Sequence, residues 1–158
     1  TQTGAVIVNT KGDIISRGAN RLHLKLRDKY SLNLPKEIIE RPAKYLNLIH
    51  AERDAIFNAN RKGKSLVGCT IYTTWSPCYF CAEVVINNGI SRVVTHQSTI
   101  DWYDKAQRDI EGRHNWHKNI EEGINALKDN NVEYECLTEP IKDVEILFDD
   151  KKQSPDKI

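Results

Sequence analysis

Two short clusters of metal-binding residue types stand out in this chain of 158 residues. The first is His50-Ala-Glu52, and the second is Pro77-Cys78-Tyr-Phe-Cys81, about 26 residues further along. One His and two Cys form a three-ligand set that suits zinc and leaves the fourth tetrahedral position for water. The sequence therefore predicts one catalytic zinc ion per chain, bound by His50, Cys78 and Cys81.

Glu52 is the candidate catalytic residue of this site. Only Ala51 separates it from His50, so His50 can bind the metal while Glu52 reaches the bound water. A catalytic zinc lowers the pKa of such a water to about 7, which makes hydroxide available at neutral pH. A structural zinc site is the alternative interpretation, but it would want a fourth protein ligand and has no use for a proton shuttle.

Both clusters are expected at the starts of helices. From Ile49 onward the apolar spacing is helical, with Ile56 and Ala59 on the same face, and Gly63 is expected to end this helix. A second helix is predicted over residues 80–88. Helix starts carry partial positive charge and unpaired N–H groups, which favour the thiolate form that zinc requires.

Five apolar runs with strand-like patterns surround these helices. They cover residues 4–8, 14–18, 69–74, 92–96 and 132–137. A third helix is predicted from apolar residues at helical spacing, which are Trp116, Ile120, Ile124 and Leu127. Strands that alternate with helices predict an α/β fold, here a three-layer α/β/α sandwich with a central five-stranded mixed sheet.

The chain is predicted to form one domain over residues 1–148. Residues 21–49 carry Pro35, Pro42 and scattered charge but no strand-length alternation, so we expect an inserted loop beside the active site. Residues 149–158 are charged and are expected to form a disordered tail.

The composition bounds the class of partner. Lys and Arg number 23 against 22 Asp and Glu, so the net charge is +1, whereas proteins that grip a polynucleotide backbone usually show a basic surplus. No apolar run approaches the roughly 20 residues that a membrane-spanning helix needs. The tight Cys78/Cys81 pair indicates a metal site in a reducing compartment, so we expect a cytoplasmic location.

The chain resembles the cytidine and deoxycytidylate deaminase superfamily from its start to about Leu137. The zinc motif is specific to the superfamily, and the flanking segments are most similar to the deoxycytidylate branch. These segments are Thr3-Gly-Ala-Val-Ile-Val8, Arg41-Pro-x-Lys44-Tyr45, His50-Ala-Glu-Arg53-x-Ala-Ile56, Tyr72-x-x-Trp75-x-Pro-Cys78-x-x-Cys-Ala82 and Asn88-Gly-Ile-x-x-Val93. The resemblance implies a cytidine-deaminase-like fold and zinc-dependent nucleobase deamination.

Differences among related enzymes favour a cytosine-type substrate. Free cytidine deaminases typically have Cys where this chain has His50, and riboflavin-pathway deaminases have a longer gap between the two Cys. Transfer-RNA adenosine deaminases and guanine deaminases usually place Glu where this chain has Ser76. Polynucleotide cytidine deaminases share Trp75-Ser-Pro-Cys78 but are usually basic, unlike this chain.

The resemblance implies hydrolysis of deoxycytidine monophosphate (dCMP) to deoxyuridine monophosphate (dUMP), with release of ammonia. Glu52 would carry a proton from the water to ring N3 and then a proton to the leaving amino group. The residues implied to bind substrate are Asn20, Arg21, Ala51, Trp75, Ser76, Pro77 and Tyr103. Arg21 is a candidate for the phosphate, and Tyr103 lies where relatives often place a residue that covers the base.

One segment departs from the deoxycytidylate branch. Its regulated members usually carry Gly-Tyr-Asn-Gly at the end of the first hairpin, whereas this chain has Gly18-Ala-Asn20-Arg21. The Gly-Ala-Asn-Arg pattern of this chain is closer to that of the transfer-RNA enzymes. This difference argues against regulation by a nucleoside triphosphate.

Two alternatives stay open beside dCMP deamination. The first is deamination of a base in RNA or single-stranded DNA, and the second is a non-catalytic, zinc-stabilised scaffold. The expected partner is a small nucleotide, with neither nucleic acid nor membrane. The resemblance also implies a homo-oligomer, because members of this superfamily commonly assemble into multimers.

Overall fold

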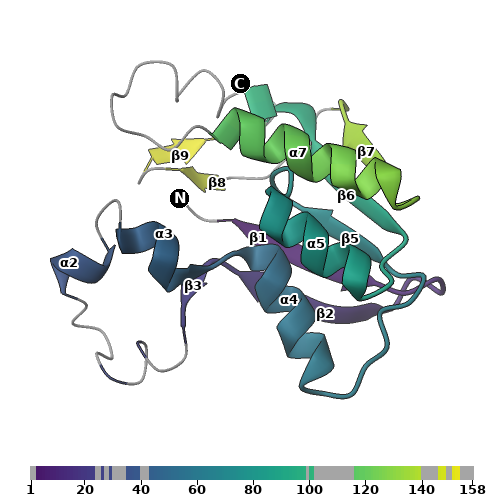
Figure 1. The fold of residues 1–158 in the computed structure, drawn as a ribbon, viewed down its shortest axis with the longest axis horizontal. Coiled ribbons are helices and arrows are strands. Elements are labelled where there is room, and N and C mark those ends of the chain that lie inside the picture. The colour runs from purple at the N-terminus through teal and green to yellow at the C-terminus, as the bar shows by residue number, and fades with distance from the viewer. Residues whose placement is uncertain are drawn as a thin grey trace.

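A five-stranded sheet with strand order β2-β1-β5-β6-β7 forms the centre of this computed structural model (Figure 1). The structure describes residues 3–23, 26, 29, 35–39, 43–98, 100–101, 116–139, 146–148 and 151–153. The sheet is mixed, because β1 pairs antiparallel with both β2 and β5, whereas β5, β6 and β7 pair in parallel. This confirms the predicted α/β fold with a central five-stranded mixed sheet.

The hairpin consists of β1 (Gly4–Val8) and β2 (Ile14–Ala19). Alternate residues of β1 are buried, which is the pattern of a strand with one face against the core. The side-chain oxygen of Asn9 accepts hydrogen bonds from the backbone of Lys11 and Asp13, both at 2.9 Å. These bonds fix the turn, the register shifts once between Ile7 and Val8, and the end of β2 reaches the neighbourhood of His50.

The parallel part consists of β5 (Thr70–Thr73), β6 (Arg92–His96) and β7 (Glu133–Leu137). Parallel neighbours need long crossover connections, which are usually helical. Helix α5 (Tyr79–Asn87) follows β5, and α7 (Trp116–Asp129) precedes β7. The start of α5 therefore lies at the carboxyl end of β5.

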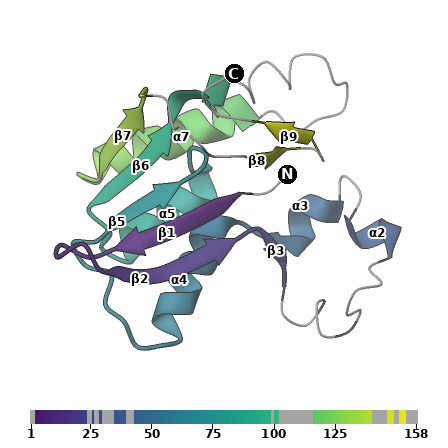
Figure 2. The same cartoon turned by 180° about the vertical axis from the view of Figure 1, so that it is seen from behind.

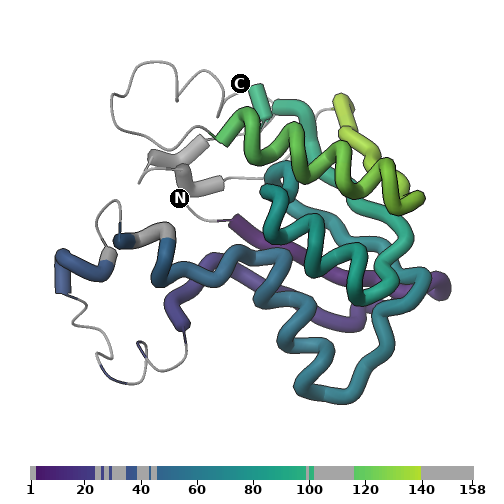
Figure 3. The backbone as a smooth tube through the Cα atoms, in the orientation of Figure 1, coloured from purple at the N-terminus to yellow at the C-terminus, as the bar shows by residue number. Residues whose placement is uncertain are grey.

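Three helices form one layer on the sheet. α4 (Ala51–Asn60) packs against β1 and β2, and α5 lies between α4 and α7. Figures 1 and 2 show this layer on one face of the sheet, with the strands foremost in the reverse view. Among the residues that the structure describes, no helix of comparable length covers the opposite face. Figure 3 shows that all three helices begin at the same end of the sheet.

The core lies between this helical layer and the sheet. Aliphatic side chains from both layers are fully buried there, among them Ile7, Ile56, Ile71, Val85, Val93 and Leu127. Burying such a side chain stabilises the fold by about 1.5–3 kcal/mol. The core thus fixes the helix starts relative to one another, and the candidate ligands lie at those starts.

The segment predicted as an inserted loop contains short elements. β3 (Arg21–Leu22) pairs with β4 (Leu48–Ile49) in a separate two-stranded sheet. Between them in sequence lie α2 (Lys36–Ile39) and α3 (Ala43–Asn47), which Figure 2 shows beyond the end of β2, outside the central sheet. Ile49 belongs to β4 rather than to the helix we predicted, because backbone pairing with Arg21 holds it extended until α4 begins at Ala51.

Two short strands lie near the end of the chain. β8 (Ile146–Phe148) pairs antiparallel with β9 (Lys151–Gln153), and of the two only β9 falls within residues 149–158, the range expected to form a disordered tail. An apolar Ile-Leu-Phe strand gives the charged residues a backbone partner, which composition alone does not reveal. In the described part of the chain, no helix is long and apolar enough to cross a membrane.

Candidate metal centre

The three candidate ligands come from two helix starts. His50 is the residue before α4 and Cys78 is the residue before α5, and both have extended backbone angles. Cys81 lies in the first turn of α5 and is fully buried. Two helices that begin at the same end of the sheet thus bring together ligands that are about 30 positions apart in sequence.

The distances between the ligand atoms fit a tetrahedral metal. The Sγ atoms of Cys78 and Cys81 each lie 3.4 Å from His50 Nδ1, and all three ligand atoms lie within 4.8 Å of one another. Zn–S bonds of about 2.3 Å and Zn–N bonds of about 2.0 Å at a tetrahedral angle place S and N about 3.5 Å apart. His50, Cys78 and Cys81 are therefore positioned to bind a zinc ion.

The pKa values of the two thiols move in opposite directions. A hydrogen bond from Cys81 lowers the pKa of Cys78, and His50 lowers it further against the effect of burial. The same hydrogen bond, together with burial, raises the pKa of Cys81. For His50, burial lowers the pKa, but the hydrogen bond to Cys78 and its charge raise it more. Without a cation the ligands share protons, and zinc would take the place of those protons.

Glu52 lies in the first turn of α4 and is only 7% exposed. Burial raises its pKa to about 7, although the nearby His50 acts in the opposite direction. A carboxyl group with a pKa near neutrality can accept a proton in one step and donate it in the next. Glu52 therefore has the properties required of a proton carrier beside the metal ligands.

The loop that leads into Cys78 is fixed by buried contacts. Ser76 is 3% exposed, and its Oγ forms a 2.7 Å hydrogen bond with Tyr134 Oη on β7. Pro77 is fully buried. The ring of Trp75 lies edge-on to Trp116 at 6.4 Å, and the Trp116 ring lies 5.7 Å from that of His50. The helix α7 thus helps to enclose the metal centre.

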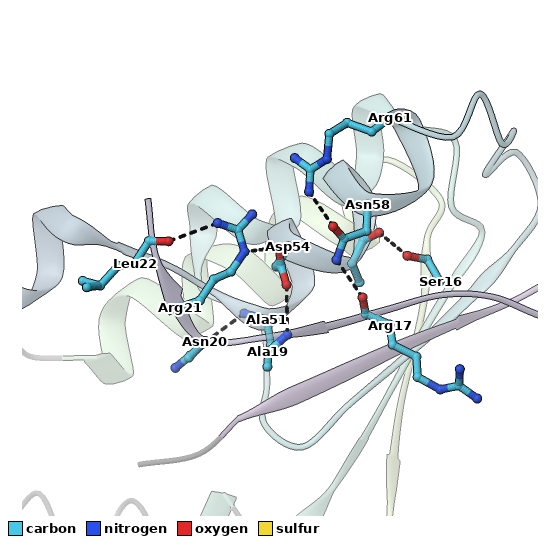
Figure 4. A network of polar contacts seen from close by, with 11 residues as sticks. Ser16, Arg17, Ala19, Asn20, Arg21, Leu22, Ala51, Asp54, Asn58 and Arg61 are labelled. Carbon is cyan, nitrogen blue, oxygen red and sulfur yellow. Dashed lines mark hydrogen bonds and ion pairs between the residues drawn. The ribbon is translucent and has the colours of Figure 1, made fainter. Parts of the chain in front are cut away.

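The end of the first hairpin lies against the start of α4 (Figure 4). The Oδ1 atom of Asn20 accepts a 2.9 Å hydrogen bond from the backbone N–H of Ala51. The side chain of Arg21 forms an ion pair with Asp54, from Nε to Oδ1 at 2.5 Å. Asn20 is therefore held next to His50 and Glu52.

Comparison with known proteins agrees with this geometry. The family model of the cytidine and deoxycytidylate deaminase zinc-binding region matches residues 1–97, which is more than half of the chain. The chain belongs to this deaminase family. The matched range, residues 1–97, includes β1, β2, α4 and α5, the elements that position the metal site.

Several curated deaminases are similar in sequence. A protein of Aliivibrio fischeri described as an uncharacterized deaminase is 38% identical over 111 residues, which are 68% of this chain and 69% of that protein. A probable deoxycytidylate deaminase of Drosophila melanogaster is 35% identical over 99 residues, which are 60% of this chain and 48% of the relative. The chain thus spans about half of that second relative's length.

A solved structure shares the fold. The dCMP deaminase of cyanophage S-TIM5, in complex with dCMP and dUMP, superposes with a TM-score of 0.59 at 21% identity. The match covers 85% of this chain and 80% of the phage protein. At this identity the likeness supports the deaminase fold alone.

The structure brings most predicted site residues of this deaminase together. The three ligands, Glu52 and the predicted substrate residues Asn20, Ala51, Trp75, Ser76 and Pro77 all lie at the starts of α4 and α5 or on the loops next to them. Arg21 is adjacent to Asn20, but its guanidinium is paired with Asp54. Tyr103 lies outside the described residues, so its predicted role stays a prediction.

Sequence reasoning missed three residues that support this site. Asp54 pairs with Arg21, Tyr134 binds Ser76, and Trp116 packs against Trp75 and His50. Asp54 had a usable signal, since an acidic residue on the inner face of a helix needs a cationic partner. No sequence pattern links Tyr134 to Ser76, because they are 58 positions apart.

Proposed function

We propose that this deaminase hydrolyses the exocyclic amino group of dCMP, giving dUMP and ammonia. The observation that carries the proposal is the buried carboxyl group of Glu52, two residues from His50 and beside a cluster that has three candidate ligands among the described residues, which suits a zinc ion with a fourth position for water. A structural zinc site would need neither feature. The zinc-stabilised scaffold is therefore the weaker interpretation.

The chemistry follows from the positions of these groups. When bound, zinc supplies a Lewis acid that makes hydroxide available at neutral pH. Glu52 accepts one proton of the attacking water and delivers it to ring N3. It then takes the remaining proton from the new C4 hydroxyl and donates it to the amino group, so that the C4 carbonyl forms as ammonia leaves. Its pKa of about 7 suits both directions of proton transfer.

Substrate orientation is assigned to the groups around Glu52. Because the N–H of Ala51 is donated to Asn20 Oδ1, the role proposed for Ala51 is to fix the Asn20 carboxamide. This leaves Nδ2 of Asn20 as a donor for the substrate. Trp75, Ser76 and Pro77 form the loop before Cys78 and would orient the pyrimidine ring from that side.

The choice of dCMP rests on three supports. The Drosophila relative is described as a probable deoxycytidylate deaminase, and Ser76 precedes Pro77 as in the cytosine branch. The net charge of +1 gives no general surface for a polyanion. A short cytosine-containing oligonucleotide is the competing substrate.

The test is ammonia release by the purified protein with deoxycytidine, dCMP and a short cytosine-containing oligonucleotide at one salt concentration. We expect dCMP to exceed deoxycytidine in kcat/KM by about a hundredfold, because charge-assisted hydrogen bonds to a phosphate contribute a few kcal/mol. Faster turnover of the oligonucleotide would show that the substrate is a polynucleotide rather than dCMP, and the proposed deamination chemistry would stand. No ammonia from any of the three would refute the proposed function.

A further inference from the structure

The end of β2 approaches the first turn of α4 unusually closely. A Cβ atom at Gly18 would lie 2.3 Å from the carbonyl oxygen of Ala51 and 2.3 Å from the backbone nitrogen of Ala55. No side chain fits there, so Gly18 is what allows the strand to contact the helix backbone. The three residues that follow Gly18 are therefore held directly over the helix start that bears His50 and Glu52.

Asp54 holds the end of β2 against α4 by binding the residues on both sides of Asn20. Its Oδ2 accepts a 3.2 Å hydrogen bond from the backbone N–H of Ala19, and its Oδ1 pairs with Nε of Arg21 at 2.5 Å. Figure 4 shows the carboxylate between these two donors. Asp54 is 5% exposed, so its charge is shielded from water and depends on these partners.

Asn20 lies between Ala19 and Arg21, the two residues that Asp54 binds. Its Oδ1 accepts a 2.9 Å hydrogen bond from the backbone N–H of Ala51. Because the oxygen is turned toward the helix, the NH₂ group of the carboxamide is turned away from it. We propose that Asp54 and Arg21 are positioning residues that hold Asn20 in its substrate-binding orientation. This inference rests on the proposed function for the role of Asn20, and on the hydrogen bonds alone for the role of Asp54 and Arg21.

The proposal assigns Arg21 a role other than the phosphate contact expected from its type. Its Nε binds Asp54, and its Nη1 donates a 3.0 Å hydrogen bond to the carbonyl of Leu22. The negative charge of Asp54 already balances the guanidinium. Its Nη2 is buried and has no hydrogen-bond partner among the described residues, whereas Nε and Nη1 are already committed to the Asp54 carboxylate and to a carbonyl. A variant of Arg21 therefore has to separate positioning from phosphate binding.

The decisive variant is Asp54→Asn. A carboxylate accepts on both oxygens, whereas an asparagine side chain must turn its NH₂ group toward either Ala19 N–H or Arg21. We expect the Ala51 amide to exchange its hydrogen about tenfold faster, because Asn20 no longer caps it steadily. Unchanged exchange at Ala51 would overturn the proposal, whatever the enzyme does.

A double-mutant cycle separates positioning from general stability. Asp54→Asn should lower kcat/KM by about tenfold in the parent but by less than about twofold in the Asn20→Ala background, because its effect passes through Asn20. Equal losses in both backgrounds would show that Asp54 only stabilises the fold. Arg21→Met serves the same cycle if Asp54→Asn does not fold, since it keeps the bond between Asp54 and Ala19.

Arg21→Met also discriminates positioning from phosphate binding. A positioning role predicts the same fractional loss of kcat/KM for deoxycytidine and for dCMP. A loss confined to dCMP would make Arg21 a phosphate ligand and overturn its positioning role. Arg92→Met is the matched control, because Arg92 also pairs with carboxylates, those of Glu133 and Glu135, but at the start of β6. It should change neither Ala51 exchange nor activity.

The two hypotheses fail in different measurements. If the parent releases no ammonia from any substrate, the proposed function fails, while Ala51 exchange still decides whether Asp54 positions Asn20. If ammonia is released but exchange and the cycle show no coupling, the positioning proposal fails alone.

Discussion

The hydroxyl groups of Tyr134 and Ser76 lie 2.7 Å apart, so that β7 is joined to the loop that leads into Cys78. Ser76 is buried and Tyr134 is partly buried, and burial raises the pKa of Tyr134. The phenol is therefore neutral at physiological pH and shares a hydrogen bond with Ser76. An element remote in sequence thus holds the residue two positions before a metal ligand.

Tyr134→Phe should destabilise the protein by about 1 kcal/mol, because it leaves the Ser76 hydroxyl buried without its partner. Urea unfolding followed by circular dichroism measures the change. Tyr72→Phe is the control, since Tyr72 is 42% exposed on β5 and exposed substitutions usually stay within about 0.5 kcal/mol. Equal stability of the two variants would mean that the hydrogen bond contributes nothing.

Metal analysis of the purified protein should give about one zinc per chain. Cys78→Ser and Cys81→Ser should each lose most of it, because a serine hydroxyl is a poor substitute for a thiolate. Cys136→Ser should retain the metal, since Cys136 contacts Gln97 and is not among the three clustered ligands. X-ray absorption that finds a fourth protein ligand would contradict the open coordination position.

Glu52→Gln should keep the zinc and the fold but lower kcat by about 10² to 10⁴, because the amide cannot carry a proton. Zinc content, thermal unfolding and ammonia release together test this expectation. Glu83→Gln is a matched control on an exposed position of α5. Activity of Glu52→Gln within about tenfold of the parent would remove Glu52 from the proposed mechanism.

Local patterns in the sequence were sufficient to predict the central sheet and the candidate metal ligands. The apolar run over residues 4–8 predicted β1, and the apolar run over residues 92–96 matches β6 in full. The spacing of Cys78 and Cys81 predicted a shared ion, because residues three apart on a helix face the same side. These features depend on neighbours in sequence, so the sequence alone was enough.

The supporting contacts could not be predicted in this way. The pair of Arg21 and Asp54 depends on how closely Gly18 lets β2 approach α4, which is a tertiary distance. The extended conformation of Ile49 depends on its pairing with Arg21 and overrides the helical pattern. The proposed phosphate role of Arg21 was drawn from residue type, and only the structure shows where its charge is used.

Gly123 should prove necessary for the metal site although it lies in the middle of α7. A Cβ atom there would meet the carbonyl oxygen of Pro77 at 2.7 Å and the carbonyl carbon of Cys78 at 3.0 Å. Glycine-to-alanine changes inside helices normally stabilise by about 1 kcal/mol, because alanine has the higher helix propensity. Here the added methyl group must push α7 away from the loop that carries Cys78.

We therefore expect Gly123→Ala to lower stability by about 1–3 kcal/mol, as overpacking usually does, and to weaken zinc binding as well. Competition with a chromogenic chelator measures zinc affinity, and urea unfolding of the zinc-free protein measures stability alone. Gly4→Ala is the control, because its Cβ would meet nothing closer than 4.0 Å. If Gly123→Ala is more stable than the parent and binds zinc equally well, α7 does not press on the metal loop. A loss of zinc affinity in the alanine variant would instead identify the contact between α7 and Pro77 as part of what holds Cys78 in place.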